Sequence, residues 1–278
     1  MHYNKDMQRR VFFISDRTGI SAETLGETLL TQFQNINFMR TDIPFVTSPE
    51  KAHLAVAQIT AAEETDGVAP LIFSTLTDPE SQSIIAAGTS HVFDLFGTYI
   101  KPLERALGVN SSHTAGRMHG MTNSDEYQHR VDALNFTLDH DDGLRPKDLA
   151  KANVVLIGVS RSGKTPTSLY LAMHFHLKTA NYPLNEEDLQ YGNLPEQLKP
   201  VHDRIFGLSI KPEQLSRIRH GRRPNSRYSS MEQCMFEVQR AETVYRESAI
   251  PFVDTTSVSI EEIATNILQH FGFERPHH

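Results

Sequence analysis

The segment from Asn153 to Met173 constrains the fold of this chain more than any other. It opens with N-V-V-L-I-G-V (Asn153–Val159), an apolar, β-branched run typical of a buried parallel strand. Residues Gly158–Thr165 then match the pattern G-x-x-x-x-G-K-T/S, in which backbone N–H groups surround a phosphate. Leu169–Met173 continues as a helix. This order of strand, glycine loop and helix predicts an α/β fold with a parallel sheet.

The glycine loop supplies eight candidate residues for binding a nucleotide: Gly158, Val159, Ser160, Arg161, Ser162, Gly163, Lys164 and Thr165. A loop of this kind directs N–H groups and the positive end of a helix at one anion. Lys164 would reach the terminal phosphates, and the Thr165 hydroxyl would lie where a Mg²⁺ ligand is needed. Arg161 either adds a charge on a phosphate or lies in solvent at the loop tip, and the sequence leaves both readings open.

Composition narrows the class of protein. The 278 residues, 38% hydrophobic and 22% charged, are typical of a globular chain with one large or two modest domains. A net charge of −7 argues against nucleic acid as a partner. We expect no membrane partner, because no apolar run approaches ~20 residues and the segment Met1–Asp6 lacks the apolar core of a signal peptide.

Cysteine and histidine usage point to a cytoplasmic protein without a structural metal. The single cysteine, Cys234, excludes an internal disulfide, and its amphipathic surroundings predict a buried structural thiol in a reducing compartment. None of the 14 histidines forms an H-E-x-x-H motif. His174 and His176 fall two positions apart in an expected helix, about 200° around its axis, so they would not share an ion.

Strand and helix signals alternate along both halves of the chain. In the first half we expect strands at 11–14, 43–46, 71–73 and 91–96, and helices at 21–33, 49–62 and 102–107. In the second half we expect strands at 154–159, 180–184, 204–210 and 251–254, and helices at 164–177, 195–202, 212–218, 230–248 and 260–271.

Between these halves lies a Gly-, Ser- and His-rich stretch, 108–124, which reads as a loop, followed by an amphipathic helix from Asp125 to about Leu138. The predicted organisation is therefore an N-terminal α/β domain (1–107), a connecting loop and helix (108–148), and a P-loop α/β domain with a parallel sheet (149–278).

Two acid-bearing turns are candidates for catalysis. Asp16 follows an expected strand and precedes a helix that Ser21 could cap, at the edge where parallel sheets bind ligands. It could hold Mg²⁺ or orient a nucleophile, or it could be a surface residue of a capped turn. Asp141 and Asp142 are adjacent, so one of them could keep a raised pKa and act as a base. They could equally hold a metal or simply end a helix.

The segment Lys211–Arg227 inverts the sign of charge in an acidic chain. Its only acid is Glu213, and its cations are Lys211, Arg217, Arg219, Arg222, Arg223 and Arg227. Such a cluster could neutralise phosphates during transfer, dock an acidic partner, or form a solvated helix face.

Several of these segments together resemble one family. The segments that carry the resemblance are Ile14–Gly19 with Ser21–Glu23, His140–Gly143, Gly158–Ala172, Ala180–Leu184 and Ser259–Ala264. The family is that of the bifunctional regulatory proteins, kinase and phosphorylase in one chain, of phosphoenolpyruvate synthase and pyruvate phosphate dikinase. The intact Gly163-Lys164-Thr165, followed by Thr167-Ser168, is more similar to the proteobacterial branch that regulates the synthase.

The resemblance implies a specific chemistry. The protein would use ADP to phosphorylate a threonine of phosphoenolpyruvate synthase, which inactivates it, and would reverse this with inorganic phosphate to give pyrophosphate. Lys164 and Arg161 would neutralise the moving phosphoryl group, Thr165 would support Mg²⁺, and Asp141, Asp142 or Asp16 would accept the proton of the threonine.

Other readings remain open from the sequence. They are a regulator of pyruvate phosphate dikinase, a P-loop kinase or NTPase acting on a small molecule, and a nucleotide-responsive regulator without chemistry. A homodimer is compatible with each of them.

Overall fold

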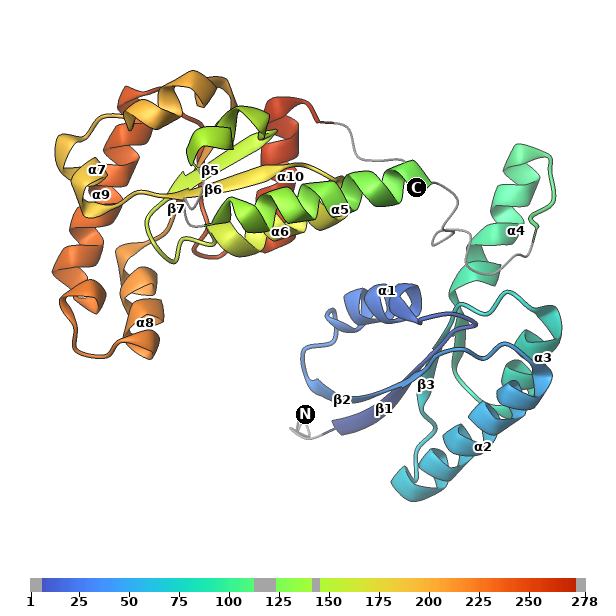
Figure 1. The fold of residues 1–278 in the computed structure, drawn as a ribbon. Coiled ribbons are helices and arrows are strands. Elements are labelled where there is room, and N and C mark those ends of the chain that lie inside the picture. The colour runs from blue at the N-terminus through green and yellow to red at the C-terminus, as the bar shows by residue number, and fades with distance from the viewer. Residues whose placement is uncertain (1–6, 113–123, 142–145, 274–278) are drawn as a thin grey trace. The chain divides into compact units, whose positions relative to one another are not determined.

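The computed structural model describes residues 7–112, 124–141 and 146–273. The chain divides into two compact units, Met1–Gly120 and Met121–His278. Each unit contains a four-stranded parallel sheet and several helices (Figure 1), which confirms the predicted α/β class. No helix of the described ranges is both long enough and apolar enough to cross a bilayer.

The N-terminal unit alternates strands and helices in chain order. Its sheet has the parallel order β2-β1-β3-β4. The elements are β1 (Met7–Ile14), α1 (Ile20–Leu30), β2 (Ile36–Ile43), α2 (Pro49–Asp66), β3 (Leu71–Ser74), α3 (Pro79–Gly88), β4 (Val92–Asp94) and α4 (Leu95–Leu107).

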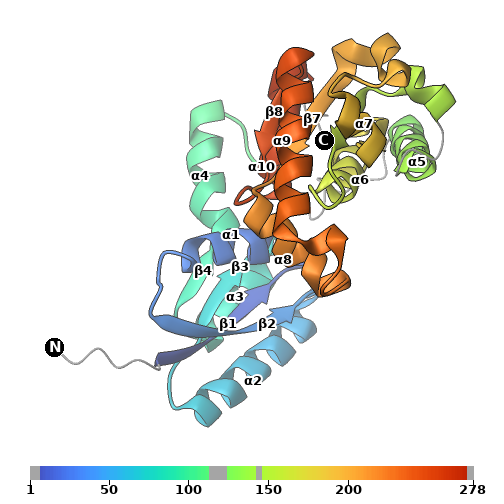
Figure 2. The same ribbon diagram turned by 90° about the vertical axis from the view of Figure 1, so that its left-hand side faces the viewer.

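Helices cover both faces of this sheet, because successive residues of a strand point to opposite sides. Phe12 and Ile14 of β1 pack with buried residues of α2 and α3. Val11 and Phe13 pack instead with residues of α1 and with Leu95 of α4. Figures 1 and 2 show α1 and α2 on opposite sides of the strands.

The bounds of three predicted elements in this unit were wrong, and helix α3 was not predicted. The second strand runs over Ile36–Ile43 rather than 43–46, because Pro44 lacks an N–H group and Phe45 takes a positive φ of 59°. None of the residues of this edge strand is buried, and polar and apolar residues mix along it, so the strand pattern was not recognised in the sequence. The helix expected at 102–107 begins at Leu95, where Asp94 caps it by accepting from Gly97 N at 2.8 Å. The strand expected at 91–96 is therefore limited to Val92–Asp94.

The C-terminal unit repeats the architecture, with the parallel order β6-β5-β7-β8. Its strands are β5 (Val154–Gly158), β6 (Thr179–Pro183), β7 (Ile205–Ser209) and β8 (Phe252–Asp254). Its α-helices are α5 (Ser124–Asp139), α6 (Lys164–Phe175), α7 (Glu186–Tyr191), α8 (Pro212–Arg222), α9 (Met231–Glu247) and α10 (Ile260–Phe271). Three 3₁₀ segments complete it: η3 (Pro146–Lys151), η4 (Glu196–Arg204) and η5 (Arg227–Ser229).

The four strands predicted in this half are confirmed to within two residues. The predicted helix 195–202 is the 3₁₀ segment η4, with Pro200 inside it, and the short helix α7 was not predicted.

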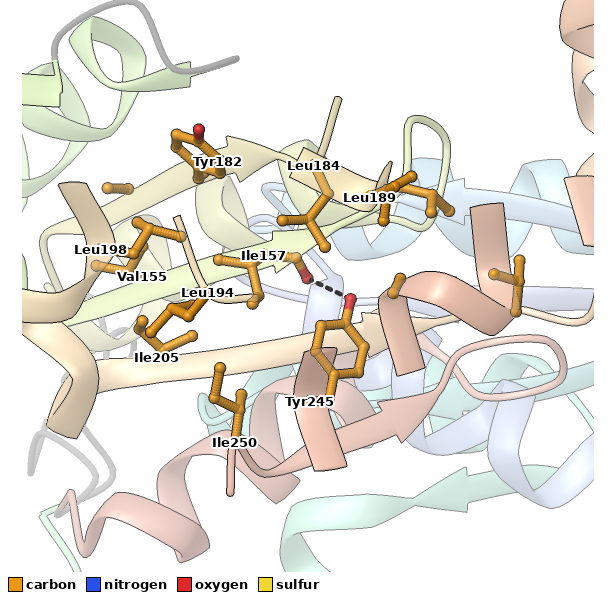
Figure 3. Packing of buried hydrophobic residues seen from close by; sticks show 14 of the residues in the cluster. Val155, Ile157, Tyr182, Leu184, Leu189, Leu194, Leu198, Ile205, Tyr245 and Ile250 are labelled. Atoms are coloured by element: carbon orange, nitrogen blue, oxygen red, sulfur yellow. Dashed lines mark hydrogen bonds between the residues drawn. The ribbon is translucent and has the colours of Figure 1, made fainter. Parts of the chain in front are cut away.

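The central strand β5 is buried on both faces, as its unbroken apolar run predicts. Val154 and Leu156 pack with α6 and α10, whereas Val155 and Ile157 pack with a cluster that includes α7, η4 and α9. In that cluster the Tyr245 hydroxyl donates to Ile157 O at 3.3 Å (Figure 3). Cys234 lies in the same cluster, fully buried, which confirms the predicted structural thiol. Burial raises the pKa of that thiol.

Candidate functional site

The glycine loop leaves the carboxyl end of β5, between β6 and β7. The chain leaves β5 toward β6 and later crosses back to β7, so the loop occupies the point of an open parallel sheet where ligands bind. Gly163, which has a left-handed φ of 96°, immediately precedes α6. No side chain in the described structure caps this helix. The N–H groups of the first turn of α6 are therefore positioned to bind an anion.

Close packing explains why position 158 is a glycine. A Cβ atom there would lie 2.5 Å from Leu208 O and 2.8 Å from Ser162 Oγ. The loop backbone thus passes β7 more closely than any side chain would permit. Arg161 is exposed and takes a positive φ of 77°, which places it at the turn of the loop.

Lys164 is buried beneath the loop. Its side chain is only 5% exposed, and Nζ donates to Gly158 O at 3.0 Å and to Val159 O at 2.9 Å. Because an ammonium group has three donors, these carbonyl contacts fix its position at the base of the loop. The lysine therefore stands next to the backbone N–H groups that would surround a phosphate.

Two neighbouring elements hold the loop in place. Arg219 of α8, which is 1% exposed, donates through Nη2 to Ser160 O at 3.0 Å and to Glu237 Oε2 at 2.6 Å. Its guanidinium group also lies 4.2 Å from the ring centroid of Tyr228. Thr255, which follows β8, donates to Ser162 O at 3.0 Å. The loop is thus braced by the segments that follow β7 and β8.

The basic segment Lys211–Arg227 therefore separates into two parts. Arg219 is buried and supports the glycine loop, a role that the sequence did not reveal. Its spacing of four residues from buried Leu215 could have indicated that it lies on the buried face of the helix. Arg227 pairs with Glu186 at 2.6 Å on the surface. The remaining cations are exposed, namely Lys211, Arg217, Arg222 and Arg223.

A polar triangle lies beside the start of α6. Thr165 Oγ1 donates to Asp141 Oδ1 at 2.9 Å, and Asn181 Nδ2 lies 3.0 Å from Thr165 Oγ1. Asn181 Nδ2 also donates to Asp141 Oδ1. Hence the structure brings Asp141 and Thr165 together, as two of the predicted site residues, and adds Asn181, which the sequence reading did not single out as a site residue.

The end of α5 places Asp141 in this triangle. α5 packs on α6 and along the edge strand β6. Thr179 N of β6 donates to Thr137 Oγ1 at 3.1 Å, and Asn181 N donates to His140 O at 3.0 Å. The edge of the sheet is thereby covered, and the residue that follows His140 is held against Asn181 and Thr165. Asp142, the other predicted acid of this turn, lies outside the described residues.

Asp16 belongs to the other unit. Its side chain is 8% exposed, and Oδ2 accepts from Thr77 N at 3.1 Å and from Thr77 Oγ1 at 2.7 Å. These bonds join the loop after β1 to the loop after β3. The expected Ser21 cap was wrong, because α1 begins at Ile20 after Gly19 in the left-handed region (φ 86°), and Ser21 lies inside the helix.

Comparison with known proteins identifies the family of this chain. The family model described as kinase/pyrophosphorylase matches residues 11–268. The chain belongs to the kinase/pyrophosphorylase family. It is accordingly a phosphotransferase of the kinase/pyrophosphorylase type, and nucleotide and phosphate use follow from that membership.

Three relatives of this family, all provisionally named phosphoenolpyruvate synthase regulatory protein, match nearly the whole chain. The relative from Marinobacter nauticus is 46% identical over 97% of this chain and 99% of its own. One from Pseudomonas putida is 47% identical over the same shares, and one from Bordetella parapertussis is 47% identical over 97% and 98%. The family resemblance drawn from the sequence is confirmed.

Proposed function

We propose that this chain is a bifunctional regulator of phosphoenolpyruvate synthase. It phosphorylates a threonine of the synthase with ADP, which inactivates the target and releases AMP. It removes the same group with inorganic phosphate, which releases pyrophosphate and restores activity. The names of relatives that are 46–47% identical over 97% of the chain support this choice of target.

The observation that carries the chemistry is the arrangement at the start of α6. A glycine loop, a buried ammonium group and an acid-bound hydroxyl gather at the carboxyl edge of one sheet. Both reactions move one phosphoryl group between two oxygens, so positioning and charge neutralisation supply most of the catalysis. A loop that binds the β-phosphate of ADP also suits inorganic phosphate and pyrophosphate, since all present similar oxygens.

Each predicted site residue has a role in this proposal. Lys164 and Arg161 neutralise the transferred group, and residues 158–165 bind the phosphates through their N–H groups. Thr165 supports Mg²⁺, which would supply further positive charge when bound. Asp141, Asp142 and Asp16 are the candidates for accepting the threonine proton. The exposed cations of Lys211–Arg227 add charge near a two-phosphate transition state.

The cytoplasmic location and the homodimer stay predictions.

A label-transfer experiment tests the proposal. The purified chain is incubated with phosphoenolpyruvate synthase and ADP labelled at the β-phosphate, and unlabelled phosphate is then added. We expect label to enter a threonine of the synthase and then to leave as pyrophosphate. Bound ADP without transfer would instead indicate a passive regulator.

Pyruvate phosphate dikinase in place of the synthase is the matched control for the target. Faster labelling of the dikinase would reassign the chain to the other branch of the family. Labelling of neither protein, with ADP consumed, would favour a kinase or NTPase of small molecules.

A further inference from the structure

Ser160 of the glycine loop is held at two of its atoms. Its carbonyl oxygen accepts from Arg219 Nη2 at 3.0 Å, and its Oγ atom lies 3.0 Å from the hydroxyl oxygen of Tyr228. The carbonyl contact already braces the backbone of the loop. The hydroxyl contact has a different effect, because it fixes the direction of a side chain in the middle of the loop.

Tyr228 is itself held in place by Arg219. The guanidinium group of Arg219 lies 4.2 Å from the centroid of the Tyr228 ring, and its Nη1 atom donates to Tyr228 O at 3.1 Å. The 3₁₀ segment η5, which carries Tyr228, is closed by a capping box between Ser226 and Ser229. A phenol held in this way loses little further freedom when it binds a partner, so its hydroxyl is preorganised toward Ser160.

The two hydroxyl groups share one hydrogen bond, which leaves one of their two protons available to another acceptor. Each hydroxyl has one donor and can also accept. A phenol is the stronger donor and an aliphatic hydroxyl the stronger acceptor, so donation from Tyr228 to Ser160 Oγ is favoured. The proton that remains available is then that of Ser160. Ser160 is only partly buried and lies between Gly158 and Gly163, in the loop whose N–H groups would surround a phosphate.

We propose that Tyr228 is a positioning residue for the phosphate that binds in the glycine loop. Its hydroxyl donates to Ser160 Oγ and thereby directs the Ser160 proton at a phosphate oxygen, with which a hydroxyl forms a stronger hydrogen bond than with a neutral acceptor. Ser160 contacts the ligand, and Tyr228 acts through Ser160. The inference rests on the proposed function, since it takes ADP and inorganic phosphate as the ligands of the loop.

A directed hydroxyl adds something that the cations of the loop do not supply. Lys164 and Arg161 attract an anion by charge, and the strength of that attraction changes little with small shifts of the anion. A hydrogen bond from a fixed hydroxyl weakens steeply when its geometry is lost, so it selects one position of the phosphate oxygen. The pair of Tyr228 and Ser160 therefore determines how precisely the transferred phosphoryl group is placed.

A double-mutant cycle in the full-length chain tests this assignment. ADP is titrated calorimetrically into wild type, S160A, Y228F and the double variant. S160A should bind ADP about tenfold more weakly. Y228F should bind it about threefold more weakly, because Ser160 keeps its hydroxyl but loses its fixed direction. The double variant should bind ADP no more weakly than S160A, since Tyr228 acts only through Ser160.

The matched control is Y191F. It makes the same chemical change in the same unit, on a tyrosine at the end of α7 that is 74% exposed, and should leave the affinity for ADP unchanged. Losses that add in the double variant would overturn the proposal. A larger loss in Y228F than in S160A would also overturn it, because Tyr228 would then be the residue that contacts the ligand.

Inorganic phosphate separates a contact with phosphate from a contact with the nucleoside. Its affinity is measured by its competition with ADP. S160A and Y228F should weaken the binding of inorganic phosphate by the same factors as the binding of ADP, because both ligands would place a phosphate in the loop. A loss confined to ADP would mean that Tyr228 acts on the nucleoside, and the proposal would fail.

A second substitution at position 228 separates the hydroxyl from the ring. Y228L removes the hydroxyl and also the ring that lies against Arg219, so it should have a lower Tm than Y228F. At a temperature where both variants are folded, they should show the same loss of ADP affinity. If Y228L binds ADP weakly and Y228F binds it like wild type, Tyr228 is only a brace and the proposal is wrong. S160T, which keeps a hydroxyl, should bind ADP within about twofold of wild type.

Label transfer to the synthase is measured separately, so that this proposal and the proposed function fail differently. The expected cycle for ADP and inorganic phosphate without any label transfer would overturn the proposed function and keep the positioning role of Tyr228. Label transfer with additive losses in the double variant would overturn the positioning role alone. A wild-type chain that binds neither ADP nor inorganic phosphate would overturn both.

Discussion

The two units share one topology but differ in what they place at the same point. Their sheets have equivalent parallel orders, β2-β1-β3-β4 and β6-β5-β7-β8. In each unit the first strand leads through a loop to a helix that begins after a left-handed glycine without a side-chain cap: Gly19 (φ 86°) before α1 and Gly163 (φ 96°) before α6. The backbone therefore prepares similar positions twice.

The side chains make the two positions chemically different. In the C-terminal unit the loop carries a buried lysine, and Asp141 accepts a hydrogen bond from the Thr165 hydroxyl at the end of the loop. In the N-terminal unit the equivalent loop carries Asp16, whose carboxylate is tied to Thr77. A buried carboxylate disfavours an anion, whereas a buried ammonium favours one. The comparison shows that topology selects the place for a ligand and that side chains select the ligand.

Removing the charged group of each loop should give the largest difference between the two units in ADP binding and label transfer. Lys164→Ala should lower label transfer more than about 1,000-fold, equivalent to about 4 kcal/mol, and weaken ADP binding, because the phosphates lose their nearest cation. Asp16→Asn should leave ADP affinity unchanged, whether or not it slows transfer as a base. Calorimetric titration of ADP into both variants checks this, and equal weakening by the two would contradict the assignment of phosphates to the C-terminal unit.

Replacing Arg219, which braces the loop, should lower the stability of the fold more than it lowers the rate of catalysis. Arg219→Leu removes the cation that pairs with Glu237 and leaves that carboxylate with the Gln233 amide donor, so we expect a loss of about 3–5 kcal/mol in the free energy of unfolding measured in urea. The Arg219→Leu, Glu237→Leu double variant should recover part of that loss. Arg10→Met in the N-terminal unit is the comparison, because the Arg10–Asp66 pair (2.8 Å) is partly exposed, and its loss should be much smaller. Equal losses would show that Arg219 is not a brace.

The glycines of the two loops should differ in tolerance. Gly158→Ala should destabilise by about 3 kcal/mol, because the new Cβ would meet the Leu208 carbonyl at 2.5 Å. Gly19→Ala should lose only about 1 kcal/mol, from its left-handed φ, since its nearest neighbour is Ser15 Cβ at 4.0 Å. Urea midpoints provide the measurement, and a Gly158→Ala variant as stable as wild type would refute the close approach of the loop to β7.

The single thiol reports on the C-terminal unit alone. Alkylation of buried Cys234 should be about 100-fold slower in the native protein than in the denatured one, because it requires that unit to open. Burial raises the pKa of the thiol, so its stabilising effect is present below the ordinary thiol pKa and lost as the pH rises through the raised value. Relative to Cys234→Ala, wild type should therefore lose stability above pH ~9. A difference between the two that is constant from pH 7 to 11 would contradict this.

Sequence alone predicted the features that local pattern determines. The buried strand β5 and the loop up to Thr165 were readable because hydrophobic run, glycine spacing and helix start all agree. The edge strand β2 was missed because half-exposed residues do not alternate cleanly. The sequence did not reveal the role of Asn181, because its partner Asp141 lies 40 residues away in the chain. It did not reveal Arg219 as a brace of the loop, because its partner Ser160 lies 59 residues away. Such contacts exist only after the sheet has assembled.

The contacts of Lys164 with the carbonyls of Gly158 and Val159 imply that phosphate binding is an exchange. Because the ammonium group has acceptors within the loop, it supports the shape of the loop by itself. A phosphate must offer more than two neutral carbonyls do, and only its negative charge meets that condition. These carbonyl contacts thus set a threshold that a neutral metabolite does not pass. The difference between the two sets of acceptors, rather than the total attraction, determines the affinity.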